Sequence, residues 1–219
     1  MTVGRQDLMV HPIEWHLLAP LYEQRHRIYH DLQHVHSILR RIGQFDGLTP
    51  DQACWLEAVT WVHDAYYDPL AQQGVNERRS VDLLLGPLGK CFTPAGLALA
   101  RKTVEATANH LVDQENIPAL MGLFLDLDLA NLSDSLDEFS EQSIRVSQEL
   151  LEAGVPEDLV IESQKRFAEH MLDRKKIYYS SVFQGRERDA RQNLRALYET
   201  PAAFLPEGLL STSPITPRP

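Results

Sequence analysis

Signals for the start of a helix recur along this chain, and they constrain its fold more than any other feature. Thr49-Pro50 and Thr93-Pro94 each join a helix-capping residue to a proline suited to the first helical turn. Apolar residues at helical spacing follow both pairs, to Tyr67 and to His110 respectively. Further stretches of this kind cover 76–85, 120–132, 133–151, 156–172 and 185–198. No convincing run of alternating strands accompanies them, so the sequence predicts an all-α fold.

The length of 219 residues suits one sizeable domain. We expect this domain to cover 13–200, after an N-terminal segment of residues 1–12. The remaining stretch, 201–219, contains five prolines with serine and threonine between them. That composition is typical of a flexible tail.

Composition and charge limit which cellular compartment and which binding partners are expected for this chain. Cys54 and Cys91 are the only cysteines, which excludes a disulfide framework and favours the reducing cytoplasm. No apolar run of about 18 residues predicts a membrane span, and none near the N-terminus predicts a secretory signal. The net charge of −10 disfavours a nucleic-acid polymer as partner. A small phosphate compound remains compatible with that charge, because a bound cation can supply local positive charge.

Four histidines, at positions 26, 30, 34 and 36, fall within eleven residues. If this stretch is helical, His30 and His34 are four residues apart and share a face. Both imidazoles could then point into one cavity. A solvated, histidine-rich helix face is the alternative.

The dipeptide His63-Asp64 ends an apolar helical stretch. A carboxylate in that setting carries a desolvation penalty that a metal ion would offset. The alternative is a water-exposed Asp64 at the helix C-terminus, where the helix dipole disfavours a negative charge. This context slightly favours a metal ligand.

Asp126 and Asp128 interrupt an otherwise apolar run. On a helix they lie about 200° apart, so only one of them usually faces a given site. A calcium-binding loop that began at Asp126 would need Gly and Glu where Asn131 and Asp137 stand, which excludes that motif.

The ordered series of a histidine, a His-Asp pair and a later aspartate resembles the HD-domain superfamily of metal-dependent phosphohydrolases. Within it, the chain is most similar to a bacterial group of predicted metal-dependent HD-superfamily phosphohydrolases, over about 22–198. Four stretches carry the resemblance: Arg27-x-Tyr-His-x-x-x-His34, Trp61-x-His-Asp-Ala-x-Tyr-Asp68, Asn76-Glu-x-x-Ser80 and Leu125-Asp-x-Asp-Leu129. The resemblance implies a helical bundle with the metal site between central helices. It also implies hydrolysis of a phosphomonoester, a nucleotide or a related small phosphate compound by metal-activated water.

Carried over to this chain, the resemblance gives one divalent ion per site, open among Mn, Mg, Fe, Co, Ni and Zn. Its implied ligands are His34, His63, Asp64 and Asp128, with Asp126 as an alternative ligand or a neighbour of the ligands. A similarity to cyclic-nucleotide phosphodiesterases makes His30 the general acid.

Further candidates have weaker support. Asp68 follows Asp64 by four residues and is a candidate to orient or deprotonate the attacking water, with a plain turn before Pro69 as the alternative. Arg27 is a candidate to bind substrate phosphate. Asn76 and Glu77 are expected to cap their helix and are candidates to contact the site. His110 is a candidate site residue that could equally be a core or surface histidine.

Two other functions compete with the phosphohydrolase. The first is an HD module that binds a nucleotide or signalling ligand without catalysis. The second is a zincin-like peptidase using His30-Asp-Leu-Gln-His34, which leaves His63-Asp64 without a role. The expected partner is a small phosphorylated substrate with no membrane involved, and the sequence leaves open whether the chain forms a homo-oligomer.

Overall fold

The computed structural model describes residues 8–11, 14, 17–113 and 115–207. Helices make up the fold of these residues, and the only pairing of β type among them is an isolated bridge between Met9 and Phe92. The predicted all-α class is therefore confirmed. The α-helices are α1 (Ala19–Tyr22), α2 (Leu32–Ile42), α3 (Pro50–Val62), α4 (Val75–Leu85), α5 (Pro94–Ala106), α6 (Ala119–Asp128), α7 (Leu136–Glu152), α8 (Glu157–Leu172) and α9 (Glu187–Glu199).

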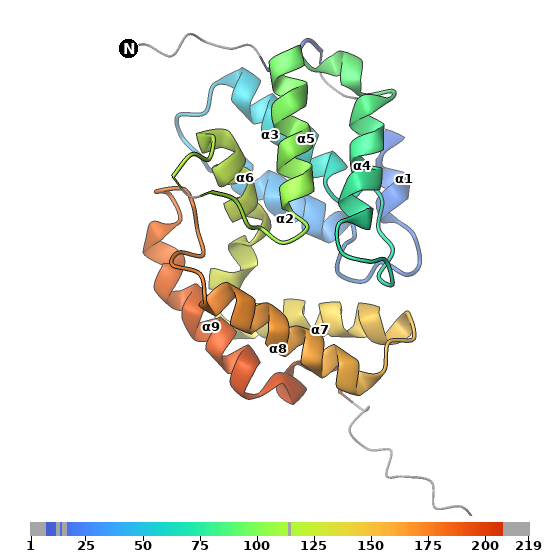
Figure 1. Cartoon of the computed structure of the whole chain (residues 1–219), viewed down its shortest axis with the longest axis vertical. Coiled ribbons are helices and arrows are strands. Elements are labelled where there is room, and N and C mark those ends of the chain that lie inside the picture. The colour runs from blue at the N-terminus through green and yellow to red at the C-terminus, as the bar shows by residue number, and fades with distance from the viewer. Residues whose placement is uncertain (1–7, 12–13, 15–16, 114, 208–219) are drawn as a thin grey trace, which may run out of the picture.

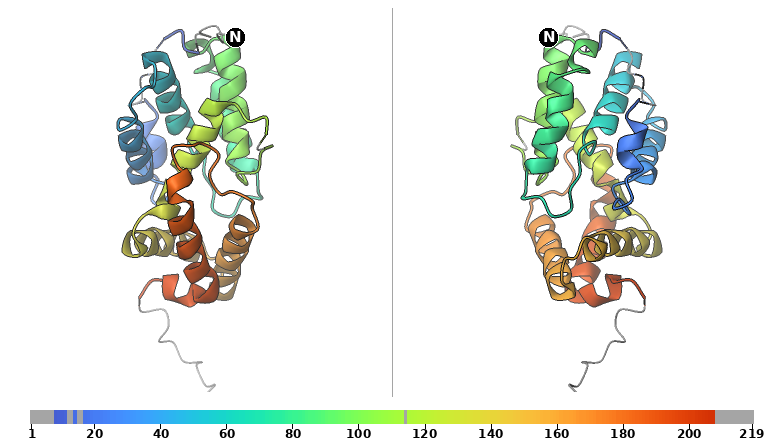
Figure 2. Two further views of the ribbon diagram at one scale, coloured as in Figure 1. Left: turned by 90° about the vertical axis from the view of Figure 1, so that its left-hand side faces the viewer. Right: turned by 90° about the vertical axis from the view of Figure 1, so that its right-hand side faces the viewer.

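The helices form two groups that lie one above the other in the view of Figure 1. Helices α2 to α6 lie together in the upper part of Figure 1, and α7, α8 and α9 lie together below them. The views of Figure 2 show the same division, with α6 descending from the upper part towards the lower one. A short 3-10 helix, Ala130–Ser133, continues the chain from α6 to α7.

The helix starts follow from local hydrogen bonding. Thr49 accepts the backbone N–H of Gln52, and the Gln52 side chain accepts the backbone N–H of Thr49. Thr93 accepts the backbone N–H of Gly96 in the same way. These side chains accept backbone N–H groups that have no partner within a first helical turn. Pro50 and Pro94 have no backbone N–H group, so no partner is needed at those positions.

The core surrounds α3 and α6, whose side chains are buried on almost every face. Trp55 is completely buried, and its indole N–H donates to the Gly96 carbonyl 3.0 Å away. Gly96 also allows close approach of the N-terminal segment, because a Cβ there would lie 2.0 Å from the Leu8 carbonyl oxygen. The chain at Leu8 and Met9 is fixed further by the Asp51 carboxylate, which accepts both backbone N–H groups.

Four helices end or begin at residues that periodicity did not predict. Helix α5 ends at Ala106 rather than His110, whose φ of 54° is not helical. Helix α3 ends at Val62 rather than Tyr67, and beyond this end the carbonyl oxygens of Asp64 and Ala65 accept hydrogen bonds from the Arg27 guanidinium. Helix α2 begins only at Leu32, since Asp31 caps it by accepting the amides of Gln33 and His34. His30 therefore precedes the helix, and the expected shared helix face of His30 and His34 is wrong. The run 120–132 divides into α6 and the 3-10 helix.

The first part of the predicted tail is packed onto the fold. Pro201–Phe204 forms a 3-10 helix, and Pro201, Phe204 and Leu205 are buried. Residues 208–219 lie outside the described residues, as do 1–7 and 12 of the predicted N-terminal segment. Among the helices that are described, none combines the length and the apolar character needed to cross a membrane.

Candidate metal centre

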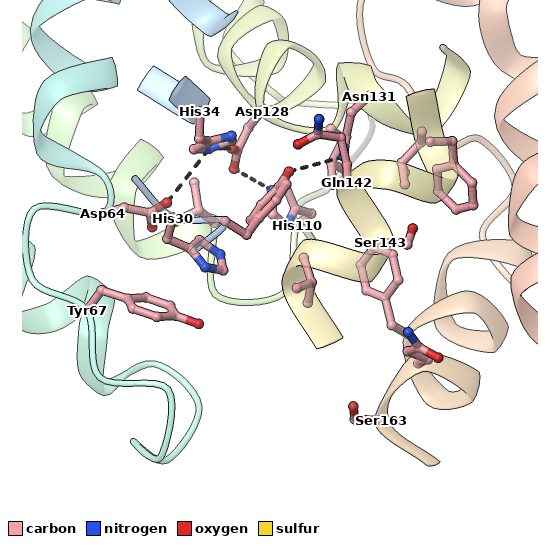
Figure 3. A pocket seen from close by; sticks show the side chains of 18 of the residues that line it. His30, His34, Asp64, Tyr67, His110, Asp128, Asn131, Gln142, Ser143 and Ser163 are labelled. Atoms are coloured by element: carbon pink, nitrogen blue, oxygen red, sulfur yellow. Dashed lines mark hydrogen bonds and ion pairs between the residues drawn. The ribbon is translucent and has the colours of Figure 1, made fainter. Parts of the chain in front are cut away.

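Four side chains from the ends of three helices converge in the upper part of the fold. His34 is the third residue of α2, His63 and Asp64 follow α3, and Asp128 is the last residue of α6. His34 Nε2 lies 3.2 Å from His63 Nε2 and 3.1 Å from Asp128 Oδ1. Asp64 Oδ2 lies 3.0 Å from His63 Nε2 and 3.8 Å from His34 Nε2. The structure thus brings together the four residues that the sequence predicts as ligands, and Figure 3 shows three of them.

The spacing and chemistry of these donors fit a divalent metal ion. The donor atoms of His34, His63 and Asp128 form one group with separations of 3.1, 3.2 and 3.5 Å. Atoms so spaced can all lie within about 2.0–2.2 Å of one ion, and Asp64 borders this group through His63. His63 Nδ1 lies 2.8 Å from the Thr60 carbonyl oxygen, which can only accept, so Nδ1 carries the proton. The lone pair of neutral His63 is then on Nε2, which faces the cluster. A backbone carbonyl fixing the tautomer in this way is the usual partner of a metal-bound imidazole.

The electrostatics of the cluster also favour a cation. Burial lowers the pKa of His63, but the carboxylates of Asp64 and Asp128 overcome burial and hold that pKa well above its ordinary value. Burial raises the pKa of Asp64 and of Asp128, and the charge of His63 overcomes it, so both carboxyls stay ionised. Two partly buried carboxylates therefore attract positive charge at this point, which a divalent ion would supply.

His110 holds the second oxygen of Asp128. Its Nε2 lies 2.9 Å from Asp128 Oδ2, and its backbone has a φ of 54°. A left-handed conformation is unusual for a residue with a Cβ and requires support from its surroundings. The backbone N–H of His110 donates to Ala106, and its carbonyl accepts the Tyr179 hydroxyl. His110 therefore orients a candidate ligand, and it also lines the adjoining cavity.

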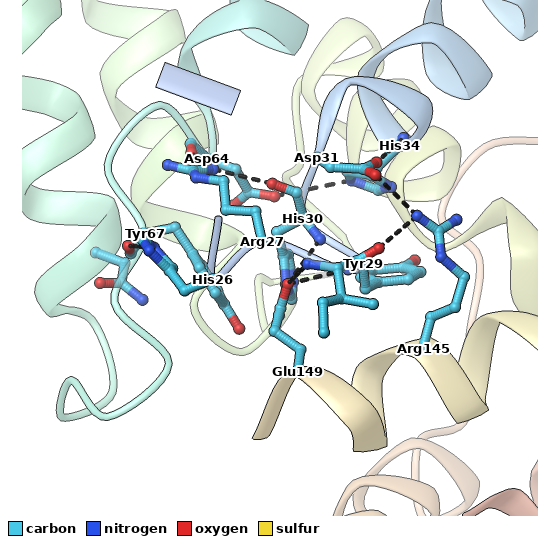
Figure 4. A network of polar contacts seen from close by, with 12 residues as sticks. His26, Arg27, Tyr29, His30, Asp31, His34, Asp64, Tyr67, Arg145 and Glu149 are labelled. Atoms are coloured by element: carbon cyan, nitrogen blue, oxygen red, sulfur yellow. Dashed lines mark hydrogen bonds and ion pairs between the residues drawn. The ribbon is translucent and has the colours of Figure 1, made fainter. Parts of the chain in front are cut away.

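His30 is anchored beside the cluster by Glu149 of α7 (Figure 4). Glu149 Oε2 accepts the backbone N–H groups of Ile28, Tyr29 and His30 at 2.8, 3.0 and 3.2 Å. Glu149 Oε1 lies 2.6 Å from His30 Nδ1, and the glutamate side chain is fully buried. The His30 ring also stacks on Tyr67, with 4.1 Å between ring centroids. With Nδ1 engaged, Nε2 is the nitrogen of His30 that can serve a ligand in the cavity.

This pairing favours the charged form of His30. Burial lowers the pKa of His30, but the hydrogen bond and charge of Glu149 overcome burial and raise it. Burial raises the pKa of Glu149, and the hydrogen bond from His30 overcomes it, lowering that pKa to about 2. Both shifts therefore favour the form of the pair in which His30 is an imidazolium and Glu149 a carboxylate.

Sequence analysis missed Glu149. Its only signal is position: Phe139, Gln142, Val146 and Glu149 follow one another at helical spacing, so Glu149 continues the inward face of its helix. A carboxylate on such a face needs a buried partner. The partner lies 119 residues away along the chain, where no local pattern indicates it.

Two predicted site residues have structural contacts instead. Arg27 is 6% exposed, and its guanidinium donates to the Gln24 side chain and to the carbonyls of His30, Asp64 and Ala65, so four of its five N–H groups are already engaged within the protein. Asp68 is exposed and accepts the backbone N–H of Leu70 at 2.9 Å. Neither residue lines a cavity at the centre, and Asp68 has the contacts of the turn residue that was its alternative.

Asp126 points away from the candidate ligands. Its two carboxylate oxygens accept the backbone N–H groups of Tyr179 and Ser180 at 2.7 and 2.6 Å. Burial raises the pKa of Asp126 and these hydrogen bonds lower it. Burial has the larger effect, and the resulting pKa is about 6. Asp126 therefore fastens the segment before α9, while Asp128 lies with the histidines.

Asn76 and Glu77 both line the cavity beside the centre. The expectation that they cap their helix is wrong, because α4 begins at Val75 with Gly74 as its N-cap residue and no side-chain cap. The Asn76 amide instead accepts the backbone N–H of Asp68 and donates to the Asp68 carbonyl, both at 3.1 Å. Glu77 Oε2 is buried and has no hydrogen-bond partner in the part of the chain that the structure describes. Burial raises the pKa of this carboxyl.

Two cavities meet at the centre. The larger, of about 390 Å³, is lined by His30, His34, Asp64, His110 and Asp128 and continues to α7 and α8. The smaller, of about 230 Å³, shares Tyr29, His34 and Asp128 and is lined also by three arginines, Arg40, Arg41 and Arg145. Arg41 and Arg145 pair with Asp134 and Asp31 at 2.6 and 2.9 Å. Both cavities therefore reach the centre, where His34 and Asp128 line each of them.

Comparison of the chain with protein-family models, with curated proteins and with solved structures gave no match.

Proposed function

We propose that this chain is a metal-dependent phosphohydrolase that hydrolyses a phosphomonoester, a nucleotide or a related small phosphate compound. The observation that carries the proposal is a set of two imidazoles and two carboxylates converging beside a histidine anchored by a buried glutamate. Together they border a cavity of a size usual for small ligands. The motif resemblance to the HD superfamily supports the same reaction.

In this proposal His34, His63, Asp64 and Asp128 hold one divalent ion, with Mn, Mg, Fe, Co, Ni and Zn all compatible with the donor set. Such an ion, when bound, would polarise a phosphoryl oxygen and lower the pKa of water. His110 keeps the Asp128 carboxylate in position through its hydrogen bond.

The proton donor in this proposal is His30. Water attacks phosphorus, the bond from phosphorus to the leaving oxygen breaks, and the proton on His30 Nε2 passes to that oxygen. Glu149 fixes the ring through Nδ1 and stabilises its charged form, so that the proton is available near neutral pH. Asp68 and Arg27 have no part in the proposed reaction.

Two alternatives are less well supported. A module that only binds a ligand has no need of an anchored, charged histidine beside its metal ligands. A peptidase of the zincin type needs His30 and His34 on one helical face, but His30 lies before α2 and its Nδ1 contacts Glu149. We also propose a cytoplasmic location, because Cys54 and Cys91 are both free thiols.

Metal analysis combined with a phosphatase panel tests the proposal. The purified protein should retain a divalent ion and hydrolyse at least one class among nucleotides, sugar phosphates and polyphosphates when supplied with each candidate metal. His34→Ala should lose metal and turnover together. His36→Ala is a matched control, since His36 lies on the same helix and is exposed.

A wild-type protein without affinity for any divalent ion would refute the proposal. Metal binding without hydrolysis of any phosphate compound in the panel would favour the non-catalytic HD module.

A further inference from the structure

The larger cavity differs in chemistry from one end to the other. Figure 3 shows His34, Asp64 and Asp128 at one end and Ser143 and Ser163 at the other. The first end holds the candidate metal ligands and His30, all charged or strongly polar. The far end lies between α7, α8 and α9, and its lining suits a ligand group that differs in polarity from a phosphate.

Apolar side chains dominate the far end. Those that line it include Leu132, Phe139, Val146, Phe167 and Leu197. Leu132, Phe139 and Leu197 are at most 3% exposed, so they belong to the packed interior of the protein. Such a wall binds a flat or apolar group well and offers little to a sugar or to a chain of phosphates.

One polar atom in this region lacks a partner. Gln164 is 6% exposed, and its Nε2 donates to the Ser147 hydroxyl and to the Phe204 carbonyl, the latter at 3.3 Å. Because a carbonyl can only accept, the amide orientation is fixed and Oε1 is the remaining acceptor. Gln164 Oε1 is buried without a hydrogen-bond partner among the described residues, and Gln164 lines the cavity.

A buried acceptor without a donor is destabilising, so a partner for it is expected. We infer that the organic part of the substrate is a flat, largely apolar ring system with an N–H donor at the edge remote from the phosphate, which pairs with Gln164 Oε1. The inference rests on the proposed function, since it assumes that a phosphate lies at the metal end. An amino-bearing nucleobase has this chemistry, whereas simple sugar phosphates and polyphosphates lack it.

Three phosphate monoesters with the same sugar and phosphate test the inference. Adenosine 5′-monophosphate carries the ring and the amino group, purine riboside 5′-monophosphate lacks the amino group, and ribose 5-phosphate lacks the ring. In the metal-loaded wild-type protein, kcat/KM should fall in that order. Loss of the donor leaves Gln164 Oε1 unpaired and should lower kcat/KM roughly ten-fold. Turnover of p-nitrophenyl phosphate, measured in parallel, reports on the proposed function by itself.

Gln164→Leu should bring the ratio between the two purine substrates close to one, because the acceptor is gone. Gln148→Leu makes the same substitution on α7 at a side chain that lines neither cavity, and it should keep the wild-type ratio. Melting temperatures of both variants show whether they fold, and the ranking in the wild type tests the inference without them.

Equal kcat/KM for the three substrates, with p-nitrophenyl phosphate turned over, would overturn this inference and leave the proposed function standing. A ratio that is unchanged in folded Gln164→Leu would overturn the role of Gln164. Failure to hydrolyse any of the four compounds with any metal would count against the proposed function, and this inference would fall with it.

Discussion

Glu149→Gln tests the anchoring of His30 most directly, because it preserves shape and removes one charge. Oε2 can keep its three backbone hydrogen bonds as the amide oxygen. The amide nitrogen then faces His30 Nδ1, which can no longer donate as it does to the carboxylate. The variant therefore loses the charge-assisted hydrogen bond that favours the protonated ring.

The size of the effect on stability follows from the pKa of Glu149. This pKa falls from the ordinary value of 4.5 to about 2, and one unit corresponds to 1.36 kcal/mol. The folded state thus favours the carboxylate by about 3 kcal/mol. Since the folded pKa is lowered, that stabilisation is present above pH 4.5 and is lost as the pH falls towards 2. Urea unfolding should show a large difference between wild type and variant at pH 7 and a smaller one at pH 3.

The effect on turnover has its own signature. Glu149 raises the pKa of His30, so the active, protonated ring is present below that pKa and is lost as the pH rises through it. In Glu149→Gln the alkaline limb of the pH profile should move to lower pH, and kcat near neutral pH should fall by about 10²–10⁴. Glu141→Gln is a control on an exposed position of the same helix. An alkaline limb that stays in place in Glu149→Gln, or unfolding free energies equal to wild type at pH 7, would refute this reasoning.

A saturating divalent ion should raise the melting temperature of the wild-type protein, because binding at a hundred times Kd stabilises it by about 2.7 kcal/mol. Asp64→Ala should abolish the shift, and a wild-type scan that is insensitive to chelator would contradict the metal site. His30→Ala should keep bound metal while kcat falls by about 10²–10⁴. That loss should shrink for p-nitrophenyl phosphate, whose leaving group needs no proton, and metal lost from this variant would instead make His30 a ligand. Asp126→Ala should lower the free energy of unfolding by about 1–3 kcal/mol for each of the two amides it leaves unpaired. Its metal content should be normal, and a metal-free Asp126→Ala would speak against Asp128 as the ligand.

Local chemistry explains which parts of the fold were predictable. The helices that begin at Pro50 and Pro94 depend on a capping threonine and a proline, which act within four residues. Helix ends involved distant contacts. Just beyond the end of helix α3, Arg27 donates to the carbonyls of Asp64 and Ala65 from a position 37 or more residues earlier in the chain. Sequence periodicity contains no trace of such a contact.

The same distinction holds at the candidate site. Ionisable residues in apolar stretches were visible in the sequence, and His34, His63 and Asp128 do lie together. The choice between Asp126 and Asp128 as a neighbour of the histidines depends on how α6 is rotated, which its mostly apolar surface does not reveal. Glu149 could not be paired with His30 from the sequence, because the contact joins helix α7 to a loop in the other half of the fold.

The contacts of α7 with the N-terminal half of the fold bear on the order in which the site forms during synthesis. Every candidate metal ligand precedes α7, while the anchor of His30 lies on α7 at Glu149, next to Arg145, which holds Asp31. Chains are synthesised from the N-terminus, and their parts fold as they emerge. A chain still on the ribosome that has emerged as far as Asp128 has all four ligands but no anchored proton donor. Under the proposed function, metal capture could therefore come before His30 is held as a proton donor, and the proposed site would be complete only when α7 docks.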